Sequence, residues 1–98
     1  MKILLACSAG MSTSLLVNNM KKFADASDVI EARPVRTVPD ILDDWDVLLL
    51  GPQVRHLQRK VKATVGDSAP VAVIDALAYG RCNGAAILKQ AEDLVNNG

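Results

Sequence analysis

A cysteine followed by a run of mostly small residues is the part of this chain best suited to chemistry. Residues 7–14 read CSAGMSTS, and the small side chains leave the backbone N–H groups after Cys7 open to an anion. Gly10 permits the left-handed backbone that a tight anion-binding loop usually requires. We therefore predict an anion-binding loop directly after the thiol. Its residues are Ser8, Ala9, Gly10, Met11, Ser12, Thr13 and Ser14.

The sulfur of Cys7 is the nucleophile that such a loop would serve. A helix is predicted to begin near Ser12, and its positive end would stabilise the thiolate, which is the reactive form of cysteine. The same loop would hold a phosphoryl group bonded to sulfur, because both species are anions. The plainer interpretation is that Cys7 is a small core residue at a strand end. Cys82 is followed by no such loop, and we expect it to be structural.

Four apolar segments are predicted to form the sheet that positions this loop. Three of them are apolar throughout, which is typical of strands buried on both faces, and the second is more polar. Pro34 in that second strand favours a place at the sheet edge. The expected strands are Ile3–Ala6, Val29–Val35, Val47–Leu50 and Val71–Ile74.

Apolar residues recur at helical spacing between and after these strands. They are Leu16, Met20, Phe23 and Ala24, then Val54, Leu57, Val61 and Val65, and finally Ile87, Leu88, Ala91, Leu94 and Val95. Thr37–Asp44 is expected to be a loop with one helical turn beginning near Pro39. Strands that alternate with helices predict a parallel sheet with right-handed crossovers. We expect an α/β fold with a four-stranded parallel sheet of order 2-1-3-4, doubly wound into three layers, α/β/α.

In this strand order the winding reverses between the first and third strands. A crevice opens at such a point, outside the carboxyl ends of the strands. Cys7 leads the loop after the first strand, and Gly51-Pro52-Gln53 leads the loop after the third. The predicted topology therefore places the thiol in this crevice.

Several catalytic motifs do not fit the loop. No Gly-Lys-Ser/Thr follows it, as a Walker A motif requires, and one histidine with two distant cysteines does not favour a metal site. Low-molecular-weight tyrosine phosphatases place Cys-x5-Arg after the first strand of a similarly wound sheet, but Thr13 stands at the arginine position here. That arginine clamps the phosphoryl oxygens in the transition state. We therefore expect a loop that holds phosphate and passes it on, rather than one that hydrolyses phosphate esters.

The composition limits the classes of partner. Ninety-eight residues, half of them hydrophobic, suit one domain with its own core. Eleven basic and eleven acidic residues balance, so we expect neither nucleic acid nor membrane insertion, and no apolar run approaches the length of a membrane span. The lack of a secretory signal in MKILLAC and two widely separated cysteines favour the cytoplasm. We expect a monomer without a cofactor.

Three segments of the chain resemble one family. They are CSAGMSTSLLV after the first strand, LLLGPQV at the third and VIDALAYGRCNGAAILK at the fourth. In this order and spacing they are similar to the IIB component of the sugar phosphotransferase system, lactose/cellobiose (chitobiose) class. The resemblance covers essentially the whole chain and implies a single EIIB type-3 (cellobiose-like) domain over residues 1–98, with a fold similar to the low-molecular-weight tyrosine phosphatases.

The resemblance implies a phosphoryl relay. A cysteine matching Cys7 accepts a phosphoryl group from a phosphohistidine on the IIA protein and passes it to a sugar bound by the membrane-embedded IIC component. The chain would then be a protein-phosphohistidine–sugar phosphotransferase that works through a phosphocysteine on a β-glucoside or disaccharide of cellobiose or chitobiose type. Residues 8–14 would bind the phosphate, and Gln53 and Tyr79 would be neighbours in the crevice. The protein would act in the cytoplasm, associated peripherally with IIC.

Two other functions stay open at this point. One is a standalone thiol enzyme, a phosphatase or an arsenate reductase. The other is a small flavodoxin-like module that holds a phosphate-bearing cofactor, for which Tyr79 would be the aromatic residue nearest the crevice. Arg55, Arg59 and Lys60 are interpreted as a solvated helix face, and His56 as a surface residue rather than a phosphohistidine.

Overall fold

The computed structural model describes residues 1–7, 11–40, 45–66 and 69–97, with the backbone alone for residues 11–14, 39–40 and 97. Its strands are β1 Lys2–Cys7, β2 Val29–Pro34, β3 Val47–Leu50 and β4 Val71–Val73. Its α-helices are α1 Met11–Lys21, α2 Gln58–Val65, α3 Ala76–Gly80 and α4 Gly84–Asn97. Two 3-10 helices, η1 Val35–Asp40 and η2 Pro52–Leu57, follow the second and third strands.

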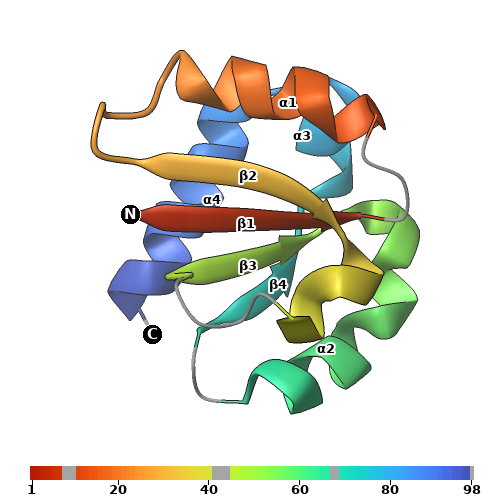
Figure 1. Ribbon diagram of the computed structural model, residues 1–98. Coiled ribbons are helices and arrows are strands. Elements are labelled where there is room, and N and C mark those ends of the chain that lie inside the picture. The colour runs from red at the N-terminus through yellow and green to blue at the C-terminus, as the bar shows by residue number, and fades with distance from the viewer. Residues whose placement is uncertain (8–10, 41–44, 67–68, 98) are drawn as a thin grey trace.

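The strands form one parallel sheet in the order β2-β1-β3-β4 (Figure 1). β1 lies inside the sheet, where Ile3 is in register with Ile30 of β2 on one side and with Val47 of β3 on the other. The more polar β2 lies at the edge. The predicted strand order is confirmed.

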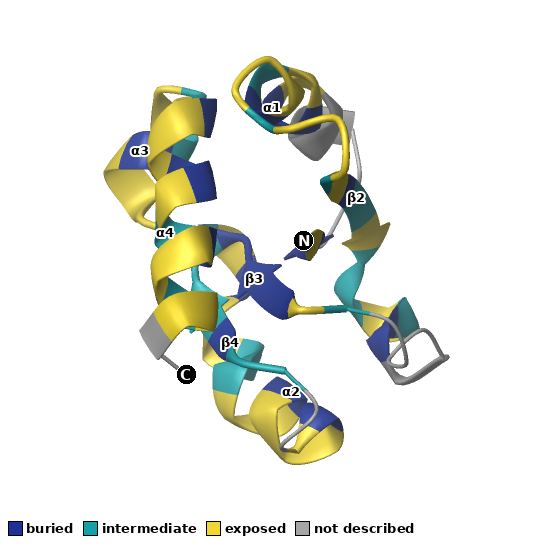
Figure 2. Ribbon diagram, turned by 90° about the vertical axis from the view of Figure 1, so that its left-hand side faces the viewer, coloured by how far each residue is buried: buried dark blue, intermediate teal, exposed yellow. Residues whose placement is uncertain are grey.

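Each face of the sheet has its own hydrophobic core, because alternate residues of a strand point to opposite faces. On the α1/α4 face, Ile3 and Leu5 pack with buried residues of α1, α3 and α4. On the α2 face, Leu4 and Ala6 pack with buried residues of η1, η2 and α2. Figures 1 and 2 show α1, α3 and α4 on one side of the sheet and α2 on the other. The three predicted layers are confirmed.

Two helix predictions were wrong in their extent. Helix α1 begins at Met11 and ends at Lys21, so Phe23 lies beyond the helix and is 58% exposed instead of joining its apolar face. The single helix predicted from the spacing of Val54 to Val65 is divided, since Val54 has a non-helical backbone (φ −113°, ψ 21°) inside η2. Gly51-Pro52 starts a 3-10 turn, with the Val54 N–H donating to the Gly51 carbonyl at 3.0 Å, and regular α-helix begins only at Gln58.

Two short helical segments also differ from expectation. The turn predicted near Pro39 begins earlier, at Val35, directly after β2; the predicted loop residues 41–44 lie outside the described residues. The five-residue helix α3 was not predicted at all.

Polar contacts close the amino end of the sheet. The N-terminal amino group donates a hydrogen bond to Asp28 Oδ1 at 3.0 Å, and the Lys2 N–H donates to Asp46 Oδ2 at 2.8 Å. The hydrogen bond from the amino group, partly opposed by burial, keeps the pKa of the Asp28 carboxyl below its usual value.

Candidate functional site

Cys7 is the last residue of β1 and lies at the carboxyl end of the sheet, in register with Pro34 of β2. The start of the loop after β3 lies against it. The Gly51 N–H donates to the Ala6 carbonyl at 2.8 Å, and a Cβ added to Gly51 would lie 3.6 Å from the Cys7 Cβ. The predicted proximity of Cys7 to the Gly51-Pro52-Gln53 segment is confirmed.

The Cys7 side chain is fully buried, with 0% of its surface exposed. We expected an open crevice in which a partner could reach the sulfur, and for the conformation described this expectation was wrong. Gly51 has no side chain to hold the two loops apart, so the backbone after β3 packs directly on Cys7. The sulfur therefore becomes reachable only when the atoms that cover it move.

The predicted phosphate-binding loop is described only in part. Ser8, Ala9 and Gly10 lie outside the described residues. Residues 11–14 form the first turn of α1, which begins one residue before the predicted start and contains no acidic side chain. The first four N–H groups of a helix have no acceptor within it, and they carry the positive end of the helix dipole. A helix N-terminus suited to an anion thus begins four residues after the thiol.

Gln53 and Tyr79, the two predicted crevice neighbours, contact each other. Gln53 Nε2 donates a hydrogen bond to the Tyr79 hydroxyl at 2.8 Å, which joins η2 to α3. The Gln53 side chain also passes over Gly51, where its Oε1 occupies the space that a methyl group would need. Gln53 therefore links the segment that lies against Cys7 to α3.

Asp75, the residue directly before α3, caps that helix. Its Oδ2 accepts a hydrogen bond from the Ala78 N–H at 2.9 Å, the typical bond of an N-cap residue, and this bond starts α3. Gln90 of α4 supports the same turn, because its Oε1 accepts from the Asp75 N–H and its Nε2 donates to the Val73 carbonyl. Gln90 lies 15 positions away from Asp75, and no local pattern in the sequence marks it.

The described part of the chain contains no group of three or more His, Cys, Asp or Glu side chains arranged to hold a metal ion. Both cysteines are present as thiols, Cys7 buried and Cys82 partly exposed. None of the described helices is long and apolar enough to cross a bilayer.

These observations define the class of protein. It is a small doubly wound α/β domain with a thiol at the end of its first strand, and a helix N-terminus follows that thiol. Residues 2–90 match the family "PTS system, Lactose/Cellobiose specific IIB subunit", and the chain belongs to this family. It is thus a IIB component of a cellobiose/lactose-type sugar phosphotransferase system, and such components are phosphotransferase domains.

Several EIIB components are similar to this chain over nearly their full length. The oligo-beta-mannoside-specific EIIB component of Bacillus subtilis (strain 168) is 38% identical over 100 residues, which cover 98% of this chain and 97% of that protein. The cellobiose-specific EIIB component of Lactococcus lactis subsp. lactis (strain IL1403) is 41% identical over 104 residues, covering 96% and 95%. The galactose-specific EIIB component of Lactococcus lactis subsp. cremoris (strain MG1363) gives the same values.

Solved structures confirm the fold. The solution structure of the cellobiose-specific phosphotransferase IIB component from Borrelia burgdorferi superposes with a TM-score of 0.81 at 36% identity, over 99% of this chain and 93% of that one. The lactose-specific IIB component domain from Streptococcus pneumoniae gives a TM-score of 0.76 at 20% identity, over 94% and 95%, and this likeness concerns the fold alone.

Proposed function

We propose that Cys7 carries a phosphoryl group from the phosphohistidine of a IIA protein to a sugar bound by a membrane IIC component. The Cys7 thiolate attacks phosphorus, an S–P bond forms, and the N–P bond breaks with its electron pair going to the imidazole, which takes up a proton. In the second step a sugar hydroxyl attacks the same phosphorus. An O–P bond forms, the S–P bond breaks, the hydroxyl loses its proton to a base and the thiolate is restored.

The observation that carries this proposal is the position of Cys7. It ends a central strand at the carboxyl end of a parallel sheet, and an α-helix N-terminus begins four residues later. Backbone N–H groups of residues 8–14 would bind the phosphoryl oxygens both before and after transfer. Thr13 stands where a related phosphatase would have its arginine, so water is not favoured as the acceptor.

Burial of the sulfur gives the proposal a conformational requirement. An in-line attack needs the sulfur in contact with the donor phosphorus, so the residues that cover Cys7 must separate while the donor is bound. The segment after Gly51 lies against Cys7, and the Gln53–Tyr79 hydrogen bond ties this segment to α3.

For the sugar we propose a β-linked disaccharide or oligosaccharide. Of three relatives at 38–41% identity, two are named for cellobiose and for oligo-beta-mannoside, which have β-glycosidic links, and one is named for galactose. Membranes that contain the IIC component of the same system would test this, with cellobiose, chitobiose and lactose offered in parallel and sugar phosphate as the readout.

The phosphorylation site is tested by intact-protein mass spectrometry with phosphoenolpyruvate, the general phosphotransferase proteins and IIA. The unmodified protein is expected to gain one phosphoryl group, Cys82→Ser to gain it equally, and Cys7→Ser to gain none while keeping its circular dichroism spectrum. Cys82→Ser is the matched control, since it removes the second thiol by the same change. Phosphate found on His56, or on Cys7→Ser, would contradict the assignment.

The same samples test the accessibility of the sulfur. Iodoacetamide should alkylate Cys7 in the native protein at a measurable rate, and phosphorylation should protect it. Reaction only at denaturant concentrations that unfold the whole domain would show that the sulfur cannot be reached in the folded state. Turnover of an aryl phosphate that depends on Cys7 would instead support a thiol phosphatase.

A further inference from the structure

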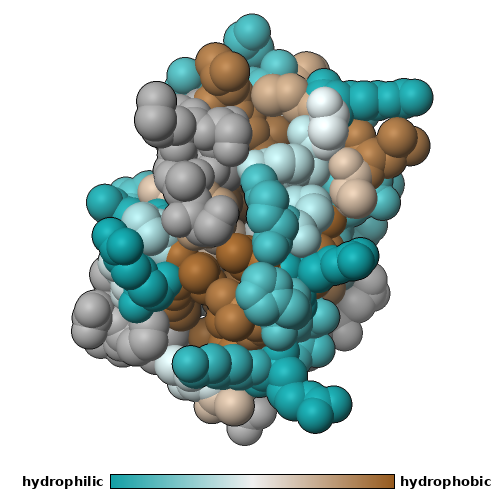
Figure 3. Space-filling model, turned by 90° about the vertical axis from the view of Figure 1, so that its right-hand side faces the viewer, coloured by the Kyte–Doolittle hydropathy of each residue, from teal (hydrophilic) through white to brown (hydrophobic). Residues whose placement is uncertain are grey.

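On the α2 face, η1 and α2 enclose a cavity of about 320 Å³ that is open to solvent. Figure 3, which looks onto the carboxyl end of the sheet, shows apolar atoms gathered in a hollow with polar atoms around it. Val38 and Val61 belong to the hydrophobic core of this face, so the cavity exposes the edge of that core. Its apolar lining consists of Val35, Val38, Leu57 and Val61.

Two cationic side chains lie beside this apolar lining. Arg36 and Lys60 line the cavity and are exposed. Residues 52–65 contain four lysines and arginines and no Asp or Glu, although the whole chain has eleven of each sign. Among the side chains that the structure describes, Asp28 pairs with the N-terminal amino group and Glu31 with Arg33, and no carboxylate pairs with Arg36 or Lys60. Solvation of an exposed helix face would account for each cation taken alone. It would not account for Arg36 and Lys60 lying together beside an apolar hollow.

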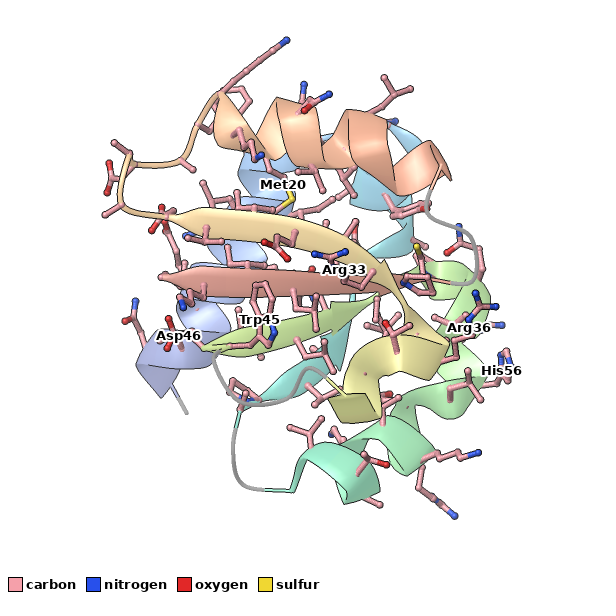
Figure 4. All side chains as sticks on the ribbon, viewed as in Figure 1. Met20, Arg33, Arg36, Trp45, Asp46 and His56 are labelled. Atoms are coloured by element: carbon pink, nitrogen blue, oxygen red, sulfur yellow. The ribbon has the colours of Figure 1, made fainter. Side chains whose placement is uncertain are left out.

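The cavity lies near the thiol. η1 follows Pro34 directly, and Pro34 is in register with Cys7. η2 begins one residue after Gly51, which packs against Cys7. Figure 4 shows Arg36 and His56 at the carboxyl end of the sheet and Asp46 at the opposite end. A protein that docks in the cavity would therefore cover the same end of the sheet as the sulfur.

We propose that this cavity is a docking site for the phosphoryl donor protein, which inserts an apolar side chain from an acidic surface. The inference rests on the relay proposed above. The cations favour the phosphorylated donor, because the phosphoryl group adds negative charge. The acceptor fits poorly, since cytoplasmic segments of membrane proteins carry an excess of Lys and Arg. A lipid surface fits poorly too, because a concave cavity receives a protruding side chain rather than a flat array of head groups.

The charge part of the proposal is tested with Lys60→Glu against Lys62→Glu. Both lysines are exposed on α2 and the two variants have the same net charge, but Lys62 does not line the cavity. The second-order rate of Cys7 phosphorylation by IIA at low salt should fall about tenfold or more in Lys60→Glu and about twofold in Lys62→Glu. The difference should shrink as salt is added, because ions screen exposed charges.

The shape part is tested without any change of charge. Thr64 lines the cavity and its exposed neighbour Ala63 does not. Thr64→Phe should fill the cavity and slow phosphorylation by IIA, whereas Ala63→Phe should leave the rate unchanged. Thermal unfolding of each variant checks that both remain folded.

The outcomes separate the two proposals. If the unmodified protein receives no phosphoryl group on Cys7 from IIA, the relay itself is wrong. If it does, but the two lysine variants react equally, general charge rather than the cavity governs the rate and the docking site is wrong. If phosphorylation by IIA is unchanged while transfer to sugar in IIC membranes slows, the cavity serves the acceptor and the assignment to the donor is wrong.

Discussion

The two faces of the sheet are packed in different ways. On the α1/α4 face, an 11-residue and a 14-residue helix lie against each other, with Gly84 of α4 seated on the backbone of Asn19 and Met20 in α1. The Gly84 N–H also donates to Asn19 Oδ1 at 2.8 Å. On the α2 face, two 3-10 helices and an eight-residue α-helix cover the sheet and leave a cavity of about 320 Å³.

If the proposed docking site is correct, this difference separates stability from recognition within a 98-residue chain. A close-packed layer tolerates little change in volume, whereas a layer with a cavity keeps apolar surface available to a partner. Cys7 lies at the carboxyl end of β1, the strand between the two layers. In the proposed relay, the α1/α4 face would hold the strand in place while elements of the α2 face move.

The largest effect is expected for Gly84→Ala, which tests how tightly the α1/α4 face is packed compared with the α2 face. The added methyl group would overlap backbone atoms of Asn19 and Met20, which cannot move without shifting α1. We expect a loss of about 2–3 kcal/mol or more in the free energy of unfolding, measured by urea denaturation. Gly80→Ala is the matched control, because nothing lies within 4 Å of the methyl group that it adds. Equal losses in both variants would mean that the contact between α1 and α4 is not tight.

A matched pair of valines compares the two layers directly. Val17 of α1 is 8% exposed and Val61 of α2 is 6% exposed, so the two differ in surroundings rather than in type or burial. Val17→Ala should cost about 2 kcal/mol of unfolding free energy, the transfer free energy of the lost groups plus a new void. Val61→Ala should cost about half as much, because a methyl group beside an existing cavity has fewer neighbouring atoms to lose.

Calorimetry or urea unfolding of both valine variants gives this comparison. Similar costs for Val17→Ala and Val61→Ala would mean that the cavity lining is as firmly packed as the opposite core.

The sheet was predictable from the sequence because its signals are local. Runs such as Val47–Leu50 are apolar throughout, and the more polar second strand with Pro34 indicated the edge, which together determined the strand order. The family resemblance implied that Gln53 and Tyr79 would be neighbours, and both lie after the carboxyl ends of neighbouring strands. The hydrogen bond between them was not predictable, because it depends on side-chain geometry across 26 positions.

Neither the burial of Cys7 nor the presence of the cavity could be predicted, because both also depend on contacts between residues far apart in the sequence. Whether a thiol at a strand end is exposed depends on how closely other segments pack, and Gly51, which lies against Cys7, is 44 positions away. The cavity depends on η1 beginning at Val35 and on the division between η2 and α2. Periodicity alone predicted one continuous helix there and gave no reason to place Arg36 beside Lys60.

The smallest expected change in stability comes from Tyr79→Phe, which removes the hydrogen bond between the two layers at the carboxyl end. The ring still packs on the α1/α4 core, and Gln53 is exposed, so the loss of unfolding free energy should be about 0.5–1 kcal/mol.

The same substitution should change the accessibility of the Cys7 thiol more than it changes stability. Gln53 passes over Gly51, and without its partner it no longer holds that segment against Cys7. In a Cys82→Ser background, where Cys7 is the only thiol, alkylation by iodoacetamide should become several-fold faster with little change in the urea midpoint. An unchanged alkylation rate would show that access to the sulfur is controlled elsewhere, and the two layers would then be independent at this end of the sheet.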